Sequence, residues 1–487
     1  MAGDPSVRIR MYRQGLGDCF LLSFNLDSEP VHFLIDCGTL GSTTTGVKLK
    51  DVVDDIAREV DSRLDVLVAT HEHQDHVSGF GESAVFDRQD IAVKRAWVAW
   101  TENPDDPRTR AITKDRRNLK AAVALTAQAL SKIQRDGQLE SIASGMNEIL
   151  GFFADYENPS QFAAHAKGVD AAMKYVTTHS RTKPRFLKPG EVLEPTWLPG
   201  VRIYVLGPPP DMAALRRMGD HGDTELYSLD RQFAGDITAC ARLRVSGKSV
   251  TAYRDDASTT EWQKLESRLP FDRRFRIDEK ADSGQCEKLY ASYFDPQSEW
   301  RRIDDDWLAS GATLAMQLDN YTNNTSLVLA FELIDSGRVL LFPADAQLGN
   351  WASWDSIRFK VRDGTRKRTV RAEDLLRRTV FYKVGHHGSH NATIRKRGLE
   401  LMESEDLVAM IPLDRQVAMK KRPPWQMPAD ALYRRLIEKT SGRVIRSDTG
   451  WPEDRHRPSD IPVEEWRQIR DNAPIEIHPN YIDFKLP

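Results

Sequence analysis

A dense cluster of ionisable side chains directly follows an apolar segment near residue 70. The segment Leu64–Thr70 is rich in Leu and Val, a composition typical of a buried strand. The next six residues contain His71, His73, Asp75 and His76. Imidazole and carboxylate groups are ligands for zinc, and also for manganese or iron. We therefore predict a metal site on a tight loop, where the end of a core strand holds the ligands in place.

The spacing of the cluster divides the ligands between two ions. His71 and His73 are two residues apart and can approach one ion together, whereas Asp75 and His76 are adjacent and can point toward a second ion. Asp75 could also orient the attacking water, which makes it a candidate catalytic residue. The alternative is a histidine-rich surface loop that binds no metal.

The pattern His-x-His-x-Asp-His after a buried strand resembles the signature of the metallo-β-lactamase superfamily. The resemblance implies an α+β fold, namely a four-layer αββα sandwich of two packed sheets with the metal site at one edge. The segments before the motif agree with the first half of such a fold. They read as three strands and a helix, at Val7–Tyr12, Cys19–Phe24, Val31–Asp36 and Lys50–Val60.

Further motifs narrow the resemblance to the ComEC-type branch, the soluble hydrolase domain of DNA-uptake competence proteins. Asn-Asn-x-Ser-Leu-Val-Leu, Ala-Asp and Lys-x-Gly-His-His-Gly-Ser follow the histidine motif in that order. In this branch Asn323 or Asn324 would neighbour the site. One departure stands out, because that branch often has Gly-His-Pro where this chain has residues 421–425, Lys-Arg-Pro-Pro-Trp.

Four downstream residues could complete the site. Asp345 follows an apolar segment and could bridge two ions. His386 and His387 also end a predicted strand, and either could complete the second ion, with a slight preference for His386. We expect His390 to lie outside the ligand set and face the substrate, which makes it a second candidate catalytic residue. The separate histidine that many superfamily members use for the first ion has no clear counterpart here.

The expected cofactor is a pair of divalent ions, Zn²⁺ with Mn²⁺ as the alternative. Such an ion lowers the pKa of bound water to about 7, so hydroxide is available at neutral pH. We expect a phosphodiesterase or nuclease that uses this hydroxide on a nucleic acid or nucleotide. The alternatives are a hydrolase of a small substrate (a lactam, a thioester or a cyclic nucleotide) and a metal-stabilised binding platform without catalysis.

Composition limits the partners and the compartment. The net charge of −3 gives no global field toward nucleic acid, so a local patch such as 366–368 or 420–422 must hold phosphate. Four cysteines without a Cys-x-x-Cys pair form no disulfide framework. No apolar run approaches membrane-spanning length, and no signal peptide is visible. We therefore expect a cytoplasmic protein with no membrane partner. The sequence does not indicate which protein, if any, it binds.

The chain is long enough for insertions in its core domain. We predict one metallo-β-lactamase-like domain over residues 1–455, with a helical insert at about 101–185, a second insert at 211–311 and a C-terminal tail at 456–487. The alternation in Thr313–Leu318 and Ser326–Ile334 predicts two paired strands joined by a turn.

Overall fold

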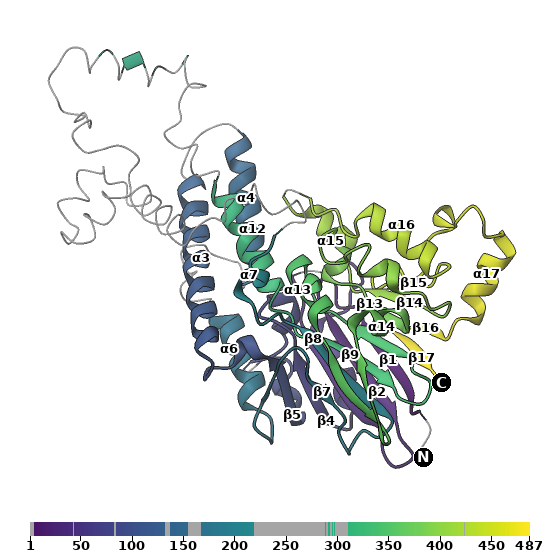
Figure 1. The fold of residues 1–487 in the computed structure, drawn as a ribbon. Coiled ribbons are helices and arrows are strands. Elements are labelled where there is room, and N and C mark those ends of the chain that lie inside the picture. The colour runs from purple at the N-terminus through teal and green to yellow at the C-terminus, as the bar shows by residue number, and fades with distance from the viewer. Residues whose placement is uncertain are drawn as a thin grey trace. The chain divides into compact units, whose positions relative to one another are not determined.

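The protein is an α+β structure with two large mixed sheets (Figure 1). This computed structural model describes residues 4–41, 43–81, 84–131, 137–153, 167–218, 310–422 and 424–487, with a few isolated residues between 288 and 297. The chain forms two compact units. The larger unit combines residues 1–113, 151–221 and 319–487, and the other combines 114–150 and 222–318. Both sheets belong to the larger unit.

The first sheet has eight strands in the order β16-β17-β1-β2-β3-β4-β5-β6. Its strands are β1 (Ser6–Tyr12), β2 (Cys19–Asn25), β3 (Val31–Cys37), β4 (Arg63–Ala69), β5 (Ala92–Ala99), β6 (Arg185–Leu187), β16 (Ile475–Ile477) and β17 (Tyr481–Leu486). Neighbouring strands are antiparallel from β16 to β3 and parallel from β3 to β6. The predicted early strands therefore form, and β4 carries the histidine motif at its carboxyl end.

The C-terminal segment belongs to this sheet, although the sequence analysis treated 456–487 as a tail. β17 pairs antiparallel with β1, from Tyr481 opposite Tyr12 to Leu486 opposite Val7. Ile482 and Phe484 are buried in the main core. The segment thus alternates as a strand does, and its partner strand lies far earlier in the chain, since Arg10 and Asp483 are 473 residues apart. Sequence-local reasoning does not detect a pairing over such a separation.

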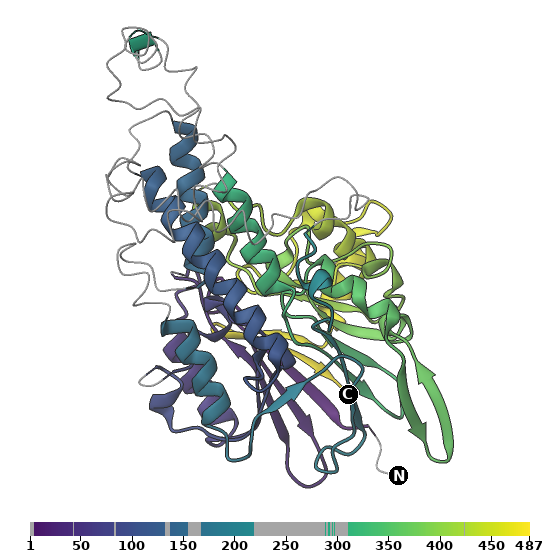
Figure 2. The same cartoon turned by 60° about the vertical axis from the view of Figure 1, so that its left-hand side comes forward.

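The second sheet has seven strands in the order β15-β14-β13-β10-β9-β8-β7. Its strands are β7 (Val192–Leu193), β8 (Val201–Gly207), β9 (Val328–Leu333), β10 (Val339–Phe342), β13 (Thr379–Lys383), β14 (Val408–Ile411) and β15 (Val444–Arg446). β10, β13, β14 and β15 run parallel, so their carboxyl ends meet at one edge. Figure 2 shows the separate hairpin of β11 (Phe359–Asp363) and β12 (Arg366–Val370) as two green strands beside this sheet.

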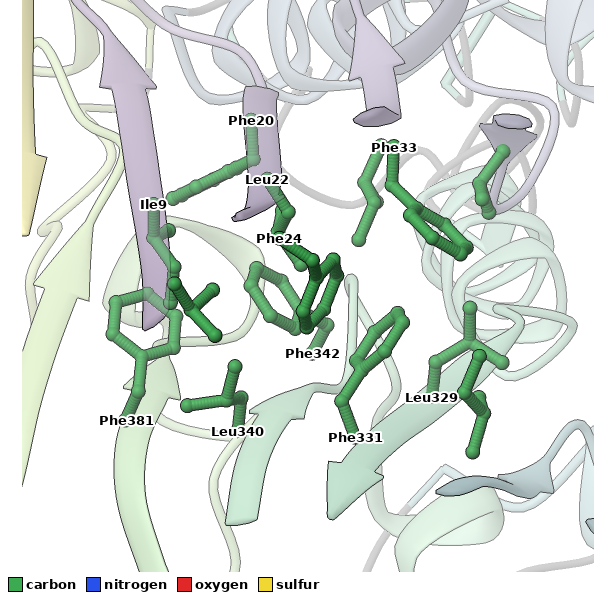
Figure 3. Close-up of a cluster of buried hydrophobic side chains, with 14 of the residues drawn as sticks. Ile9, Phe20, Leu22, Phe24, Phe33, Leu329, Phe331, Leu340, Phe342 and Phe381 are labelled. Carbon is green, nitrogen blue, oxygen red and sulfur yellow. The ribbon is translucent and has the colours of Figure 1, made fainter. Parts of the chain in front are cut away.

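One hydrophobic core lies between the facing sides of the two sheets (Figure 3). Phe20 on β2 meets Phe342 on β10 with ring centroids 5.9 Å apart. Phe33 on β3 meets Phe331 on β9 at 5.4 Å. A second core lies on the other side of the first sheet, under α1 (Leu49–Glu59) and α6 (Lys167–Thr178). This layering is consistent with the expected αββα sandwich.

The remaining described helices follow the chain order. They are α2 (Gln74–Val77), α3 (Pro107–Ser131), α4 (Gly137–Gly151), α7 (Met212–Leu215), α12 (Ser310–Asn323), α13 (Leu348–Ser353), α14 (Ala372–Arg377), α15 (Arg415–Lys420), α16 (Asp430–Lys439) and α17 (Val463–Asn472). The predicted insert at 101–185 contains α3, α4 and α6, whereas most of the insert at 211–311 lies outside the described residues. None of the helices described here is long and apolar enough to cross a membrane.

One predicted strand is wrong. Residues Thr313–Leu318 lie inside α12 rather than in a strand beside β9. The places on both sides of β9 are taken by β8 and β10. Leu314, Leu318 and Tyr321 are buried at a spacing of four and three residues, which is a helical face. The apparent alternation was too short to separate a strand from a helix.

Candidate metal centre

The four motif side chains are buried at the carboxyl end of β4. The strand ends at Ala69, and the short helix α2 begins at Gln74. The four residues are fully buried, and they are His71, His73, Asp75 and His76. Burying so many ionisable groups is costly unless they are paired or bind an ion.

The second sheet brings the downstream residues to the same place. Asp345 follows β10, and His387 follows the neighbouring parallel strand β13. The Oδ2 atom of Asp345 lies 3.1 Å from Nε2 of His76. The Nε2 atom of His387 lies 2.9 Å from Oδ2 of Asp75. The edges of both sheets therefore contribute to one cluster.

Within the described residues, three overlapping groups of side chains have ligand atoms within 4.8 Å of one another. The groups are His71–His76–Asp345, Asp75–Asp345–His387 and Asp18–Asp36–His76. All of their members are buried. Asp345 and His76 each belong to two of the groups, so either residue could serve more than one set of ligands. The overlapping groups could hold metal ions.

The hydrogen bonding of the cluster supports this assignment. Several buried imidazole and carboxylate atoms have no hydrogen-bond partner in the described part of the chain, and four of them belong to the proposed ligands: Nε2 of His73, Oδ1 of Asp75, Nε2 of His76 and Oδ2 of Asp345. Buried polar atoms nearly always have a partner, so four in one place need an explanation. Imidazole nitrogens and carboxylate oxygens are the atoms that zinc takes as ligands. The residues present therefore fit divalent ions.

Neighbouring groups fix the protons of the first two histidines. The hydroxyl of Thr70 donates to Oδ2 of Asp36 at 2.7 Å, so it accepts from Nδ1 of His71 at 3.1 Å. That leaves the Nε2 atom of His71 unprotonated, and it lies 3.0 Å from Nδ1 of His73. The proton on that Nδ1 then leaves Nε2 of His73 with a free lone pair. The lone pair of His71 Nε2 accepts from His73 in this ion-free state, so an ion held by both residues would replace their hydrogen bond.

Two further histidines are oriented in the same way. Nδ1 of His76 lies 2.7 Å from Oδ2 of Asp36. Nδ1 of His387 donates to the carbonyl oxygen of Pro412 at 2.6 Å, because a carbonyl only accepts. Ligand histidines usually donate their other ring N–H to a carboxylate or a backbone carbonyl. This arrangement points Nε2 of both residues into the ligand cluster.

The geometry favours His387 over His386 as an ion ligand, against the slight preference in the sequence analysis. Nδ1 of His386 lies 3.3 Å from the amide nitrogen of Gln347, which is a donor. The same nitrogen lies 3.4 Å from Oδ2 of Asp319, and this fixes the amide orientation. Nδ1 of His386 is thus an acceptor, whereas Nδ1 of His387 is a donor. Among the described residues, His387 shares a group of close ligand atoms with Asp75 and Asp345, and His386 belongs to no such group. The backbone N–H of His386 instead holds Oδ1 of Asp345 at 3.0 Å.

A buried lysine fixes the orientation of Asp345. Nζ of Lys383 donates to the carbonyl oxygen of Ala344 at 2.8 Å and to Oδ1 of Asp345 at 3.1 Å, and it also pairs with Asp18. Burial raises the pKa of Asp345, but His76 and Lys383 outweigh burial and hold this pKa well below its usual range. Only Oδ2 of Asp345 remains for an ion.

The charge states of the histidines follow from burial and from their neighbours. Burial lowers the pKa of His71 and of His73 well below the usual value, so both are neutral at pH 7. Burial also lowers the pKa of His76, but Asp345 and Asp18 outweigh it and raise that pKa well above the usual value. A neutral imidazole is the form that binds metal, and an ion would displace the proton of His76.

The backbone is strained where the cluster is built. Asp36, Ala344, His386 and His387 have φ angles of 58°, 51°, 43° and 53°. They make up half of the eight non-glycine residues with positive φ in the described part of the chain. Such conformations are uncommon and concentrate at functional sites. The surrounding contacts hold these loops in place despite the cost.

Three predicted residues lie elsewhere or have another role. His390 is exposed at the end of the His386 loop, and its assignment as a substrate-facing residue stays a prediction. Asn324 is structural, because its amide group binds Leu215 and Asn350. Arg368, in the predicted phosphate patch at 366–368, is engaged by Asp363 and Glu332 within the protein.

The sequence analysis did not identify the residues that support the ligands. Asp36 and Asp18 end strands and turns as many aspartates do, and nothing local marks them. Lys383 offered a signal, since a lysine closes the apolar run Thr379–Lys383. The sequence around Gln347 gave no such signal, because Gln347 orients His386 only through a contact between distant segments.

The chain was also compared with known proteins. No family model matches it. No curated protein matches it either. The site is therefore described by its own geometry.

Proposed function

We propose that this protein is a dinuclear metal-dependent hydrolase of the metallo-β-lactamase type that cleaves phosphodiesters, with a nucleic acid ahead of a cyclic nucleotide. The observation that carries the proposal is the set of buried imidazole and carboxylate atoms that have no hydrogen-bond partner where two sheet edges meet. A structural cluster of buried charge would satisfy these atoms internally.

The proposed ligands fall on two sides of Asp345. His71 and His73 would hold one ion, and Asp75 with His387 would hold the other. Oδ2 of Asp345 and Nε2 of His76, which lie 3.1 Å apart, would complete the two sets of ligands. Two bound ions would lower the pKa of a water molecule and offset the charge that grows on a substrate oxygen.

The side chains of the protein position this chemistry. Without an ion, Nε2 of His387 donates to one oxygen of Asp75, and metal binding would replace this proton. The other oxygen of Asp75 is available to orient a water molecule. Lys383 holds one oxygen of Asp345 and directs the other into the cluster. The oxygen ligand at Asp345, where lactamases of the superfamily often have cysteine, favours a phosphodiester over a lactam.

A substrate panel tests the proposal. Zinc- and manganese-loaded protein would be assayed with bis(p-nitrophenyl) phosphate, single-stranded DNA, RNA, cyclic dinucleotides and a chromogenic lactam. We expect hydrolysis of phosphodiesters that a chelator abolishes. The double variant His71→Ala/His73→Ala should lose it, whereas His478→Ala, a surface histidine between β16 and β17, should keep it. Lactam hydrolysis without any phosphodiester cleavage contradicts the proposal. Bound ions without turnover of any substrate would favour the binding-platform alternative.

A further inference from the structure

A basic segment with a tryptophan lies beside the ligand loop. It begins at the last residue of α15 and contains Lys420, Lys421, Arg422 and Trp425. The backbone N–H of Trp425 donates to the carbonyl oxygen of Ala418 at 3.0 Å, which ties the segment to α15. This is the stretch where the sequence departs from the ComEC-type pattern.

The other end of the segment is fixed to the loop that carries the cluster histidines. The backbone N–H of Ala429 donates to the carbonyl oxygen of Gly388 at 2.9 Å. Gly388 has a φ of +81°, and a Cβ at this position would lie 2.7 Å from Cβ of Pro428. The close approach therefore requires glycine, and it holds the basic segment next to His387.

A row of aromatic rings connects this segment to the ligands. Phe152 stacks on Trp425 with ring centroids 5.1 Å apart and an interplanar angle of 7°. The Phe152 ring lies 5.1 Å from the ring of His73 and 6.3 Å from that of His386. One aromatic layer thus separates Trp425 from a proposed ion ligand.

The row begins in the interior and ends at the surface. His73 is fully buried and Phe152 is nearly so, whereas Trp425 is half-buried. Phe152 covers one face of the Trp425 ring, and the ammonium of Lys421 lies over the ring, 5.2 Å from its centroid. Lys420 and Arg422 are exposed. An aromatic surface and exposed positive charge therefore occur together.

We propose that this segment binds single-stranded nucleic acid, with Lys420 and Arg422 on the phosphates and an unpaired base stacked on Trp425. The inference rests on the proposed phosphodiesterase function and names its substrate class. Base stacking on aromatic side chains combined with a cationic backbone contact is the usual mode of single-strand binding. A base would stack on the exposed part of the Trp425 ring, beside the Lys421 ammonium. A base paired inside a duplex cannot reach the ring.

The test compares two probes of equal length and charge. One is a single-stranded phosphorothioate oligonucleotide, which resists hydrolysis, and the other is its abasic counterpart. Binding to the metal-loaded protein would be measured by fluorescence anisotropy. Trp425→Ala should weaken binding of the base-bearing probe about tenfold and leave the abasic probe unchanged. Trp425→Phe should retain most of the affinity. Trp197→Ala, at another half-buried tryptophan, is the matched control and should change neither probe.

The cations have a separate signature. Lys420→Ala combined with Arg422→Ala should weaken both probes and reduce the slope of log K against log salt by about 1.4 for single strands. Metal content, measured for each variant, shows that the ligand cluster still forms.

Several outcomes would overturn the inference. These are equal binding of both probes by the unaltered protein, an unchanged affinity in Trp425→Ala, and tighter binding of a duplex than of a single strand. Each can occur while bis(p-nitrophenyl) phosphate is still hydrolysed, so the inference can fail while the proposed function holds. If no phosphodiester is hydrolysed, the proposed function fails whatever the binding result.

Discussion

Two clusters of buried charged residues lie in the second sheet, one near the start of β10 and the other beyond its end. At one end Glu332 on β9, which pairs with the first residue of β10, is 1% exposed. At the other end Asp345 follows the last residue of β10 and is 0% exposed. The two carboxylates are equally buried in the same sheet, but their surroundings differ.

Glu332 is satisfied by the protein alone. One of its oxygens accepts from Arg202 at 3.1 Å and from Tyr204 at 2.6 Å. The other accepts from Arg378 at 2.6 Å and from Arg368 at 3.4 Å. Burial raises the pKa of Glu332, but hydrogen bonds from Tyr204 and Arg378 outweigh burial and lower it.

Asp345 is only half satisfied. Its Oδ1 is held by Lys383 and by a backbone N–H, whereas its Oδ2 makes no aligned hydrogen bond in the described structure and has only Nε2 of His76 nearby, at 3.1 Å. The difference shows that burial of charge does not by itself mark a functional site. What distinguishes the ligand cluster is buried polar atoms that the protein leaves without partners, and the predictions below test this distinction.

The largest effect is expected at the satisfied cluster and concerns stability. Glu332→Ala leaves three arginines without their shared carboxylate and should lower the free energy of unfolding by about 3–5 kcal/mol. Urea denaturation measures it. Glu403→Ala removes an exposed carboxylate 3.7 Å from Arg377 and should cost less than about 0.5 kcal/mol. If Glu332→Ala lowered the free energy of unfolding as little as Glu403→Ala does, Glu332 would not be the satisfied buried charge described above.

At the ligand cluster the main effect is expected on activity. Asp345→Asn removes the charge of a proposed metal ligand, so hydrolysis of bis(p-nitrophenyl) phosphate should fall more than about 100-fold, beyond the usual effect of an outer-shell change. Urea denaturation of the metal-free protein measures the accompanying loss of stability, which is expected because Lys383 and His76 lose the charge with which they pair. Asp363→Asn, in the Glu332 cluster, should keep full activity. A stable Asp345→Asn enzyme with normal activity would contradict the assignment.

A smaller effect is expected where the protein positions a ligand. Lys383→Met removes the cation that holds Oδ1 of Asp345, and metal affinity should fall about 10–100-fold. Competition with a chromogenic chelator measures the affinity. Lys383→Arg retains the positive charge and should therefore keep part of the metal affinity that Lys383→Met loses. Unchanged affinity in Lys383→Met would mean that Asp345 is oriented without this lysine.

The smallest effect concerns pH and the satisfied cluster. The pKa of Glu332 is lowered in the folded protein from an ordinary value of 4.5, so its ionised form stabilises the fold above that value. This contribution is lost as pH falls through the lowered pKa. The stability difference between the unaltered protein and Glu332→Gln should therefore narrow below pH 4.5, as urea denaturation at several pH values would measure. If the difference in the free energy of unfolding between the two proteins instead grows as pH falls, ionised Glu332 does not stabilise the fold as proposed.

The sequence predicted the parts of the site that are local. His71, His73, Asp75 and His76 belong to one loop, and their residue types and spacing carry the chemistry. The loops of Asp345 and His387 were found because each ends an apolar strand. Parallel pairing of β10 and β13 then brings them together.

What the sequence did not predict depends on contacts between distant segments. The choice of His387 over His386 rests on the carbonyl of Pro412 and on the amide of Gln347. The role of Arg368 rests on Glu332, 36 residues earlier. The helix at Thr313–Leu318 and the strand Tyr481–Leu486 were missed for the same reason. A short hydrophobic pattern fits either a helix or a strand, and the segments that pack against it decide between them.

The central claim is that the unpartnered atoms around Asp345 bind metal. The most direct measurement is an equilibrium titration of the metal-free protein with Zn²⁺, read by calorimetry and by elemental analysis of the loaded protein. The account predicts two ions per chain, one ion in His71→Ala/His73→Ala, and a rise in thermal stability on loading. A folded protein that binds neither zinc nor manganese, and whose thermal stability neither ion changes, would contradict it.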